Sequence, residues 1–330
     1  MALNPVDNIH AFQIHAGTEG RRAGHNFEDL LANSINELPY PINTLSTPTH
    51  KKHIYTGNPA QLLLHYISQR LNIREIVYAR AVATGKLATS ETAYEILEIN
   101  GVSVRKSKSD LIIEITSSNG EYHAVGVSVK QCNTARPTNA QLYFTTAQGF
   151  ARLLQNNNIF ISNDAMTALR QFCGDTGFQP SPVGRLIDHR RYFWEEILSR
   201  GKYELESIFN THQDLISLLL FQKAYSGESF PPTFLLHKTK RVENINQTEV
   251  ALFAISELIT LSRLYQQFTT KPYSVRKGAF RDPIGVTHLA PRFGVIQMQR
   301  GGQRQHPEQL QFNLGAGYFY KLQELCNMQP

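Results

Sequence analysis

The fold of this chain is decided by residues 109–130, which read SDLIIEITSSNGEYHAVGVSVK. Apolar side chains recur at every second position on both sides of Asn119-Gly120, a pair that is typical of a tight turn between antiparallel strands. The segment therefore predicts two strands, at about 109–116 and 122–130, that pair as a hairpin.

The two faces of this predicted hairpin differ in character. One face carries an apolar set that we expect in the core, made of Leu111, Ile113, Ile115, Val125, Val127 and Val129. Because successive side chains of a strand point to opposite faces, Asp110, Ser128 and Lys130 share the other face. Antiparallel pairing places Asp110 and Lys130 near the same end of the hairpin.

Outward from the hairpin, helical and strand patterns alternate along the chain. Helical periodicity is found at about 26–37, 61–71, 90–97, 145–154, 163–172, 190–200, 203–224 and 248–267. Further strands are predicted at 95–105, 294–299 and 309–314. The fold class is therefore α/β (or α+β), with a central mixed β-sheet flanked by helices and a C-terminal helical and β-hairpin extension.

The stretch 177–182, GFQPSP, interrupts these patterns and is the best boundary in the sequence. It predicts a core at 1–175, followed at 176–330 by a helical segment and a basic C-terminal β region, unless the two form one continuous domain. Basic residues exceed acidic ones by six overall, and residues 271–330 hold eight basic and three acidic residues. Such a basic segment favours a polyanion as partner, although an ordinary basic surface has the same composition.

Composition excludes several classes of protein. With 41% hydrophobic and 18% charged residues, the chain has the balance of a globular protein. No apolar run approaches the ~18 residues that a membrane span needs, and the N-terminus lacks the pattern of a secretory signal. Cys132, Cys173 and Cys326 are far apart and form no CxxC pair, which favours a reducing compartment, the cytoplasm.

Common catalytic motifs are missing as well. The sequence has no GxxxxGK[ST] loop, no GxGxxG after a strand and no HExxH. A P-loop nucleotidase, a dinucleotide-binding enzyme and a zinc protease are therefore excluded.

Asp110 and Lys130 suit the cleavage of phosphodiesters. A carboxylate is the ligand that Mg²⁺ prefers, and a cation beside the attacking water and the phosphate completes a metal-assisted hydrolytic site. The two residues supply these two roles at one end of the hairpin.

The strand-borne pattern Asp110-x19-Lys130, with an acidic helix upstream, resembles the PD-(D/E)xK nuclease superfamily, which includes the type II restriction endonucleases. The resemblance covers mainly residues 24–150. It implies a restriction-endonuclease-like core and a Mg²⁺-dependent endonuclease that cleaves double-stranded DNA at a specific sequence. It also implies a homodimer and a cognate DNA methyltransferase.

Two positions depart from the family pattern. Ser109 replaces the usual proline, and Ser128 replaces the usual second carboxylate. Some family members with Ser-Val-Lys here place that carboxylate on a helix about a dozen residues downstream, but the first acid after Lys130 is Asp164. Glu28 resembles the helix glutamate that many members direct at the metal, with Asp29 as the alternative. Asp110 and Glu28 are thus the expected metal ligands, and Ser128 joins Asp110, Lys130 and Glu28 as a catalytic residue.

DNA recognition is expected from two other segments. Arginine reads guanine edges and asparagine or glutamine reads adenine edges, so segments rich in these residues are suited to base readout. The expected DNA-binding residues are Arg136, Asn139, Gln141, Gln299, Arg300, Gln303 and Arg304. The last four belong to a proposed C-terminal hairpin that enters the major groove as a two-stranded ribbon.

Two rival functions remain open at this stage. A DNA-binding protein without catalysis needs only the basic segment, and the missing second carboxylate favours it. A structure-selective nuclease of the same superfamily is the other alternative.

Overall fold

The computed structural model describes residues 8–44, 52–85, 87, 97–105, 107–132, 134–135, 139–181, 183, 191–222, 228–240, 244–265, 267–274, 276–277, 280–281, 283–300 and 309–328. The chain forms two compact units, each assembled from separate segments. The seven-stranded unit comprises Glu19–Ala140, Leu220–Leu261 and Gly315–Pro330, and the five-stranded unit comprises Met1–Thr18, Gln141–Leu219 and Ser262–Leu314.

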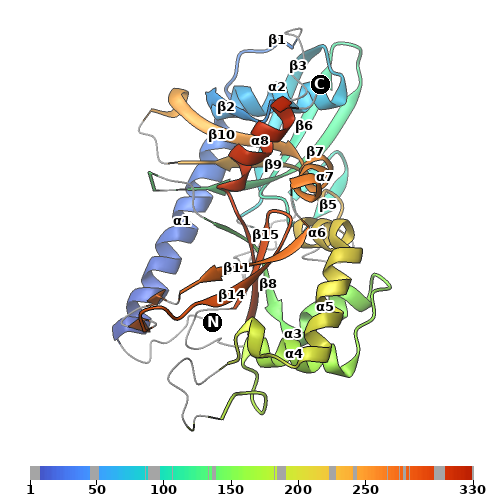
Figure 1. Cartoon of the computed structure of the whole chain (residues 1–330). Coiled ribbons are helices and arrows are strands. Elements are labelled where there is room, and N and C mark those ends of the chain that lie inside the picture. Colours follow the sequence, from blue (N-terminus) through green and yellow to red (C-terminus); the bar gives the residue numbers. More distant parts are fainter. Residues whose placement is uncertain are drawn as a thin grey trace. The chain divides into compact units, whose positions relative to one another are not determined.

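The seven-stranded unit is built on a mixed sheet with the strand order β1-β3-β6-β7-β9-β10-β2 (Figure 1). Its strands are β1 (Ile42–Asn43), β2 (Ile54–Gly57), β3 (Glu75–Ala83), β6 (Leu111–Ser117), β7 (Tyr122–Gln131), β9 (Pro232–Lys238) and β10 (Thr248–Ala254). The β7–β9 pair is parallel and the other adjacent pairs are antiparallel. The predicted β6–β7 hairpin is confirmed, with Leu111 opposite Val127.

Helices flank this sheet, as expected. Those with residues in this unit are α1 (Asn8–Asn36), α2 (Pro59–Leu71), α7 (Ile255–Tyr265) and α8 (Tyr318–Met328), with the 3₁₀ turn η2 (Ile245–Gln247). Leu31 of α1 and Leu64 of α2 are buried in one core cluster with the apolar face of β6 and β7. Phe319 of α8 packs instead against His237 and Phe253.

A short hairpin covers the other side of β6. It consists of β4 (Leu97–Ile99) and β5 (Val102–Val104), which pair with each other in a separate two-stranded sheet. Ile112 of β6 packs with Ile99 and Val104 in a small buried cluster. β6 therefore buries apolar side chains on both faces, with Glu114 as the polar exception in its middle. The polar residues Ser109 and Asp110 directly precede the strand.

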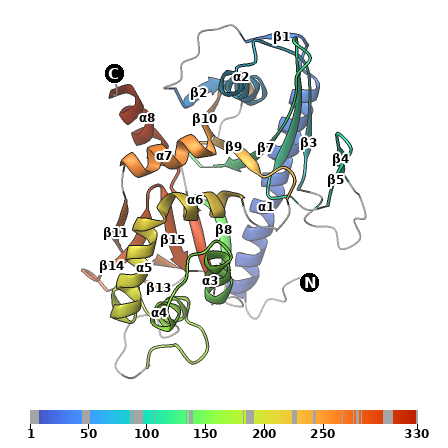
Figure 2. The same ribbon diagram turned by 90° about the vertical axis from the view of Figure 1, so that its right-hand side faces the viewer.

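The five-stranded unit contains a β-sheet and several helices (Figure 2). Its strands, in sheet order, are β11 (Phe268–Tyr273), β14 (His288–Phe293), β15 (Ile296–Arg300), β16 (Gln309–Leu314) and β8 (Ala140–Thr146), with a separate pair β12 (Arg276–Lys277) and β13 (Phe280–Arg281). The helical elements with residues here are α3 (Ala147–Gln155), α4 (Asn163–Cys173), η1 (Trp194–Glu196), α5 (Ser199–Thr211) and α6 (Gln213–Gln222). Its core is aromatic, because Phe209 stacks on Phe293 and Phe150 packs against Phe312.

Three sequence expectations are corrected here. Residues 248–254 form the strand β10 rather than the start of a helix. Both faces of this strand are buried, so its sequence lacks the alternation of apolar and polar residues that identifies a strand. Within 190–200 the described part holds the short turn η1 before α5 begins at Ser199. The predicted strand at 95–105 is the β4–β5 hairpin, and β3 takes the place beside β6. Residues 90–96 of a predicted helix lie outside the described residues.

Two further expectations concern location. Within the described residues, no helix is long and apolar enough to cross a membrane. Cys132, Cys173 and Cys326 are buried free thiols, in agreement with the absence of a disulfide framework.

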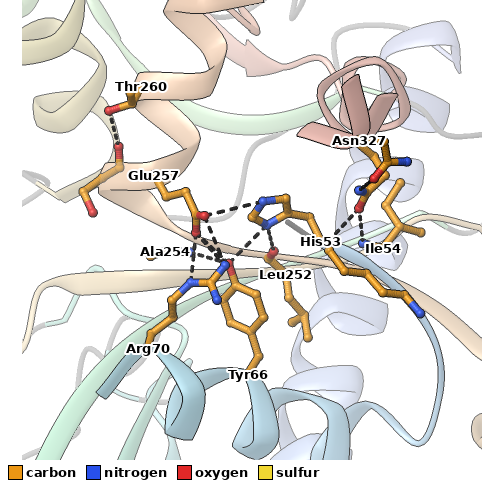
Figure 3. A network of polar contacts seen from close by, with 12 residues as sticks. His53, Ile54, Tyr66, Arg70, Leu252, Ala254, Glu257, Thr260 and Asn327 are labelled. Atoms are coloured by element: carbon orange, nitrogen blue, oxygen red, sulfur yellow. Dashed lines mark hydrogen bonds and ion pairs between the residues drawn. The ribbon is translucent and has the colours of Figure 1, made fainter. Parts of the chain in front are cut away.

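A partly buried ionic network ties α2 to α7 in the seven-stranded unit (Figure 3). Glu257 accepts from Arg70 Nε and Nη2 at 3.1 and 3.0 Å and from Tyr66 Oη at 3.0 Å. His53 Nε2 lies 3.6 Å from Glu257 Oε1. Burial lowers the pKa of His53, and the nearby Glu257 carboxylate opposes that shift. Glu257 is thus the acid on which three side chains converge.

We expect Glu257→Ala to lower the free energy of unfolding by about 2–4 kcal/mol, because it leaves the Arg70 guanidinium, whose side chain is 13% exposed, without its carboxylate. Urea unfolding monitored by circular dichroism measures the change. The control is Glu121→Ala, whose side chain is 65% exposed and for which we expect a change of about 0.5 kcal/mol or less. Equal midpoints for the two variants would contradict this role of the network.

Candidate active site

The site begins at Asp110, the residue immediately before β6. Its backbone N–H donates to the carbonyl of Val127 at 2.9 Å, and its carbonyl accepts from the N–H of Thr84 at 3.0 Å. The backbone of Asp110 is therefore held from both neighbouring strands, β7 and the end of β3. These two backbone hydrogen bonds fix the point at which the Asp110 side chain extends from the sheet.

The Asp110 carboxylate folds back onto β7. Its Oδ2 atom accepts from the Val129 N–H at 2.6 Å, from Lys130 Nζ at 2.8 Å and from Ser128 Oγ at 3.2 Å. The Lys130 ammonium also donates to the Val129 carbonyl at 3.0 Å. The sequence placed Asp110, Ser128 and Lys130 on one face at one end of the hairpin, and the structure brings all three into direct contact.

Glu28 reaches the same place from α1. It is 9% exposed, and its pKa is raised to about 7, first by burial and then by the nearby Asp110 carboxylate, while Lys130 acts in the opposite direction. Both contributions indicate that Glu28 lies near Asp110 and Lys130. Asp29 also raises the pKa of Glu28, but it is a smaller contribution than Asp110. Glu28 is thus the residue of this pair that shares the site with Asp110.

Gly85 creates room for the α1 side chains. A methyl group on its Cα would lie 2.6 Å from His25 Nδ1 and 3.1 Å from Glu28 Oε2. His25 therefore lies beside Glu28, three residues earlier on the same helix, where i and i+3 side chains are neighbours. Sequence reasoning missed His25, although this spacing was a signal for it.

Two more groups at the site were missed by sequence reasoning. The pKa of Lys108 is lowered to about 8, mainly by burial and then by Lys130. His237 of β9 is registered opposite Lys130, and its pKa is lowered to about 4 by burial and by that lysine. His237 is therefore neutral at pH 7. For Lys108 the signal was strand alternation with Asp110, whereas His237 lies on a strand that was not predicted.

Ser109, where the family pattern has proline, has a local structural role. Its hydroxyl donates to the Phe230 carbonyl at 2.7 Å, and its N–H donates to Ser107 Oγ at 3.1 Å. A proline has neither donor. These bonds attach the segment entering β9 to the start of β6, so the departure from the pattern is compatible with the same backbone geometry.

Glu114 of β6 has partners of its own away from Asp110. It accepts from Arg80 Nη1 at 3.1 Å and from Tyr122 Oη at 2.7 Å. Within the described residues, no three His, Cys, Asp or Glu side chains are arranged to hold a metal ion together. The assignment of Asp110 and Glu28 as metal ligands stays a prediction.

The expected DNA-binding residues are partly described. Asn139 and Gln141 are exposed, and Gln141 Oε1 accepts from Gln311. Gln299 Oε1 accepts from Asn313, and Arg300 donates to the Tyr192 carbonyl at 2.8 Å. Arg136, Gln303 and Arg304 lie outside the described residues.

The free ribbon expected at the C-terminal hairpin is corrected by the sheet topology. β15 and β16 do pair antiparallel, with Gln299 opposite Gln311. However, β14 and β8 flank them in the five-stranded sheet. Over its described strands the hairpin is therefore internal to a sheet and has no free edge to enter a groove as a two-stranded ribbon.

Comparison with known proteins finds distant structural similarity alone. No family model matches the chain, and no curated protein matches it. Among solved structures, the restriction endonuclease MspI in complex with its cognate DNA is similar at a TM-score of 0.43 and 11% identity, over 77% of this chain and 78% of that chain. So distant a similarity decides neither the family nor the activity.

The raised pKa of Glu28 predicts a pH-dependent stability. The unfolded chain loses this proton near pH 4.5 and the folded chain near pH 7, so raising the pH across this window removes stability. We expect the free energy of unfolding of the unsubstituted protein to fall by about 2–3 kcal/mol relative to Glu28→Gln between pH 4.5 and 7.5. Urea unfolding in EDTA at several pH values measures it, and a difference that stays constant with pH would contradict the placement of Glu28.

Proposed function

We propose that this chain is a Mg²⁺-dependent endonuclease that cleaves double-stranded DNA at a specific sequence, as type II restriction enzymes do. The observation that carries the proposal is the contact of Lys130 Nζ with Asp110 Oδ2 at 2.8 Å, beside a buried Glu28. A cation and two carboxylates are the groups that metal-assisted phosphodiester hydrolysis needs.

The residues fit a Mg²⁺ ion that keeps several of its waters. Mg²⁺ is commonly held by one or two carboxylates, and Asp110 and Glu28 supply two. Their proximity raises the pKa of Glu28, so a divalent cation between them would relieve an existing repulsion. When bound, the metal stabilises the charge that develops on the phosphate and lowers the pKa of a bound water.

The remaining groups hold this arrangement in place. The Val129 N–H and the Ser128 hydroxyl fix one oxygen of Asp110, so the carboxylate is oriented before any ligand arrives. Lys130 places a positive charge where the scissile phosphate and the attacking water would meet. His237, neutral and fully buried beside Lys130, adds no competing charge.

Other parts of the proposal come from the family resemblance. We assign catalysis to residues 1–175 and most of DNA recognition to 176–330. The proposed DNA contacts are Gln299, Arg300, Gln303 and Arg304 in the second region, and Arg136, Asn139 and Gln141 in the first. The active form would be a cytoplasmic homodimer in which each subunit cuts one strand, accompanied by a methyltransferase of the same specificity.

Cleavage of plasmid DNA in the presence of Mg²⁺ tests the proposal. We expect discrete fragments from the unsubstituted protein and a loss of ~10²–10³-fold or more in rate for Asp110→Ala and for Lys130→Ala, because each removes a charge that acts in the transition state. The control is Lys52→Ala, an exposed lysine of the same unit, which should cleave at the normal rate.

Other outcomes separate the rival functions. DNA binding without cleavage would identify a non-catalytic DNA-binding protein, a role that Ser128 in place of the usual second motif carboxylate favours. Nicking or a smear would identify a structure-selective nuclease. Cleavage that survives both substitutions would show that the assigned site is wrong.

Gly85→Ala tests the site without removing a charge. The added methyl group overlaps His25 and Glu28, which are side-chain ends that can move. We expect a loss of cleavage of ~10-fold or more, because small displacements at a catalytic centre are costly, together with an almost unchanged melting temperature. Gly24→Ala is the matched control, since its methyl group meets nothing within 4 Å and should leave cleavage unchanged. Equal rates for both variants would contradict the role of Glu28.

A further inference from the structure

The five-stranded unit contains a pocket of about 360 Å³ that the proposed cleavage site does not use. Residues from α4, β11, β14 and β15 line it, together with Arg191. Its volume lies at the lower end of the ~300–1,000 Å³ typical of small-molecule sites. The pocket therefore suits one compact ligand.

Two guanidinium groups give this pocket its charge. Arg300 Cζ lies 4.4 Å from the centre of the Phe193 ring, and Arg300 Nη1 donates to the Tyr192 carbonyl at 2.8 Å. Arg191 is 5% exposed. Burial raises the pKa of Tyr273, and the charges of Arg300 and Arg191 lower it. Arg300 also forms a hydrogen bond with the Tyr273 hydroxyl. Two arginines therefore converge on one phenol, and Arg300 is held there by aromatic packing.

Glu195 is the acid near Tyr273, and its carboxylate is bonded to other residues. Glu195 raises the pKa of Tyr273, so it acts on the same region. Its two carboxylate oxygens contact His288 Nδ1 and the Leu289 N–H, each at 3.1 Å. Among the described residues that line the pocket there are two arginines and no carboxylate.

The rest of the lining is planar or carries amides. Phe172 and Tyr273 contribute aromatic rings, and Gln297 and Gln299 contribute amide groups. The Gln299 carbonyl is fixed by Asn313 Nδ2 at 2.8 Å, which orients its amide group. Guanidinium groups match phosphate oxygens, aromatic rings match the face of a base, and glutamine amides match its edge.

We propose that this pocket binds a nucleotide, with Arg191 and Arg300 on the phosphate and with the base between the aromatic and amide walls. The same chemistry is offered by a free nucleoside monophosphate and by a nucleotide unstacked from DNA. All the lining residues belong to the five-stranded unit, whereas Asp110, Lys130 and Glu28 belong to the other, so the inference goes beyond the proposed cleavage reaction. Gln299 and Arg300 are also proposed DNA contacts, so binding of a nucleotide within DNA rests on the proposed function, whereas binding of a free nucleotide does not.

The sole tryptophan provides the measurement. Trp194 contacts Phe172 edge-to-face, with 5.4 Å between the ring centres, so a ligand that touches Phe172 should change its fluorescence. We expect saturable binding of dAMP in EDTA, weakened at least 10-fold by Arg300→Lys and by Arg191→Lys, which keep the charge and lose the planar fork. Arg263→Gln, an exposed arginine of the same unit paired with Asp214, is the control and should bind normally.

A second arm distinguishes the two sources. A DNA duplex containing 2-aminopurine becomes more fluorescent when that base is unstacked. Suppose that the unsubstituted protein increases the 2-aminopurine fluorescence, that Arg300→Lys does not, and that neither binds dAMP. This result would support the pocket and would identify its ligand as a nucleotide of DNA. Three results would overturn the proposal. They are the absence of both fluorescence changes, an equal affinity for inorganic phosphate and dAMP, and unchanged binding in both arginine variants. Repeating the titration with Lys130→Ala separates it from the cleavage reaction, because that variant should bind dAMP normally.

Discussion

The pairing of Asp110 with the end of β7 is the interaction on which the site depends. Its backbone is held by Val127 and Thr84, and its carboxylate is held by the Val129 N–H at 2.6 Å. Because Lys130 follows directly on the same strand, its ammonium reaches the same oxygen at 2.8 Å. The hydrophobic register that buries Leu111 against the core therefore also sets the position of the ion pair, and a slip of one residue would separate the two.

Glu28 introduces an electrostatic conflict into this arrangement. It is buried next to a second carboxylate, and the folded protein holds it at a raised pKa of about 7. A stabilising role would not require such a placement, since a buried acid near another acid opposes folding at neutral pH. Ionisable groups with strongly shifted pKa values are common where a protein binds a cation or does chemistry. The proposed divalent ion would remove the repulsion between Glu28 and Asp110.

The sequence predicted Asp110, Ser128 and Lys130 because strand alternation is local and has a period of two. Glu28 came from resemblance to a family pattern, because its contact with Asp110 joins residues 82 positions apart, which no periodicity encodes. The neighbours His237 and Gly85 were missed for the same reason. β10 was taken for a helix because Val250 and Phe253 are buried alike, and the C-terminal hairpin was taken for a free ribbon because the flanking β14 and β8 are distant in sequence.

The central claim is that Asp110 and Glu28 together hold one divalent cation. Calorimetric titration of the full-length protein with Mn²⁺, used as a substitute for Mg²⁺, measures this binding most directly. The account predicts one site per chain, loss of that site in both Asp110→Asn and Glu28→Gln, and release of a proton on binding below pH 7 that is absent from Glu28→Gln. One site retained with unchanged affinity in both variants would contradict it.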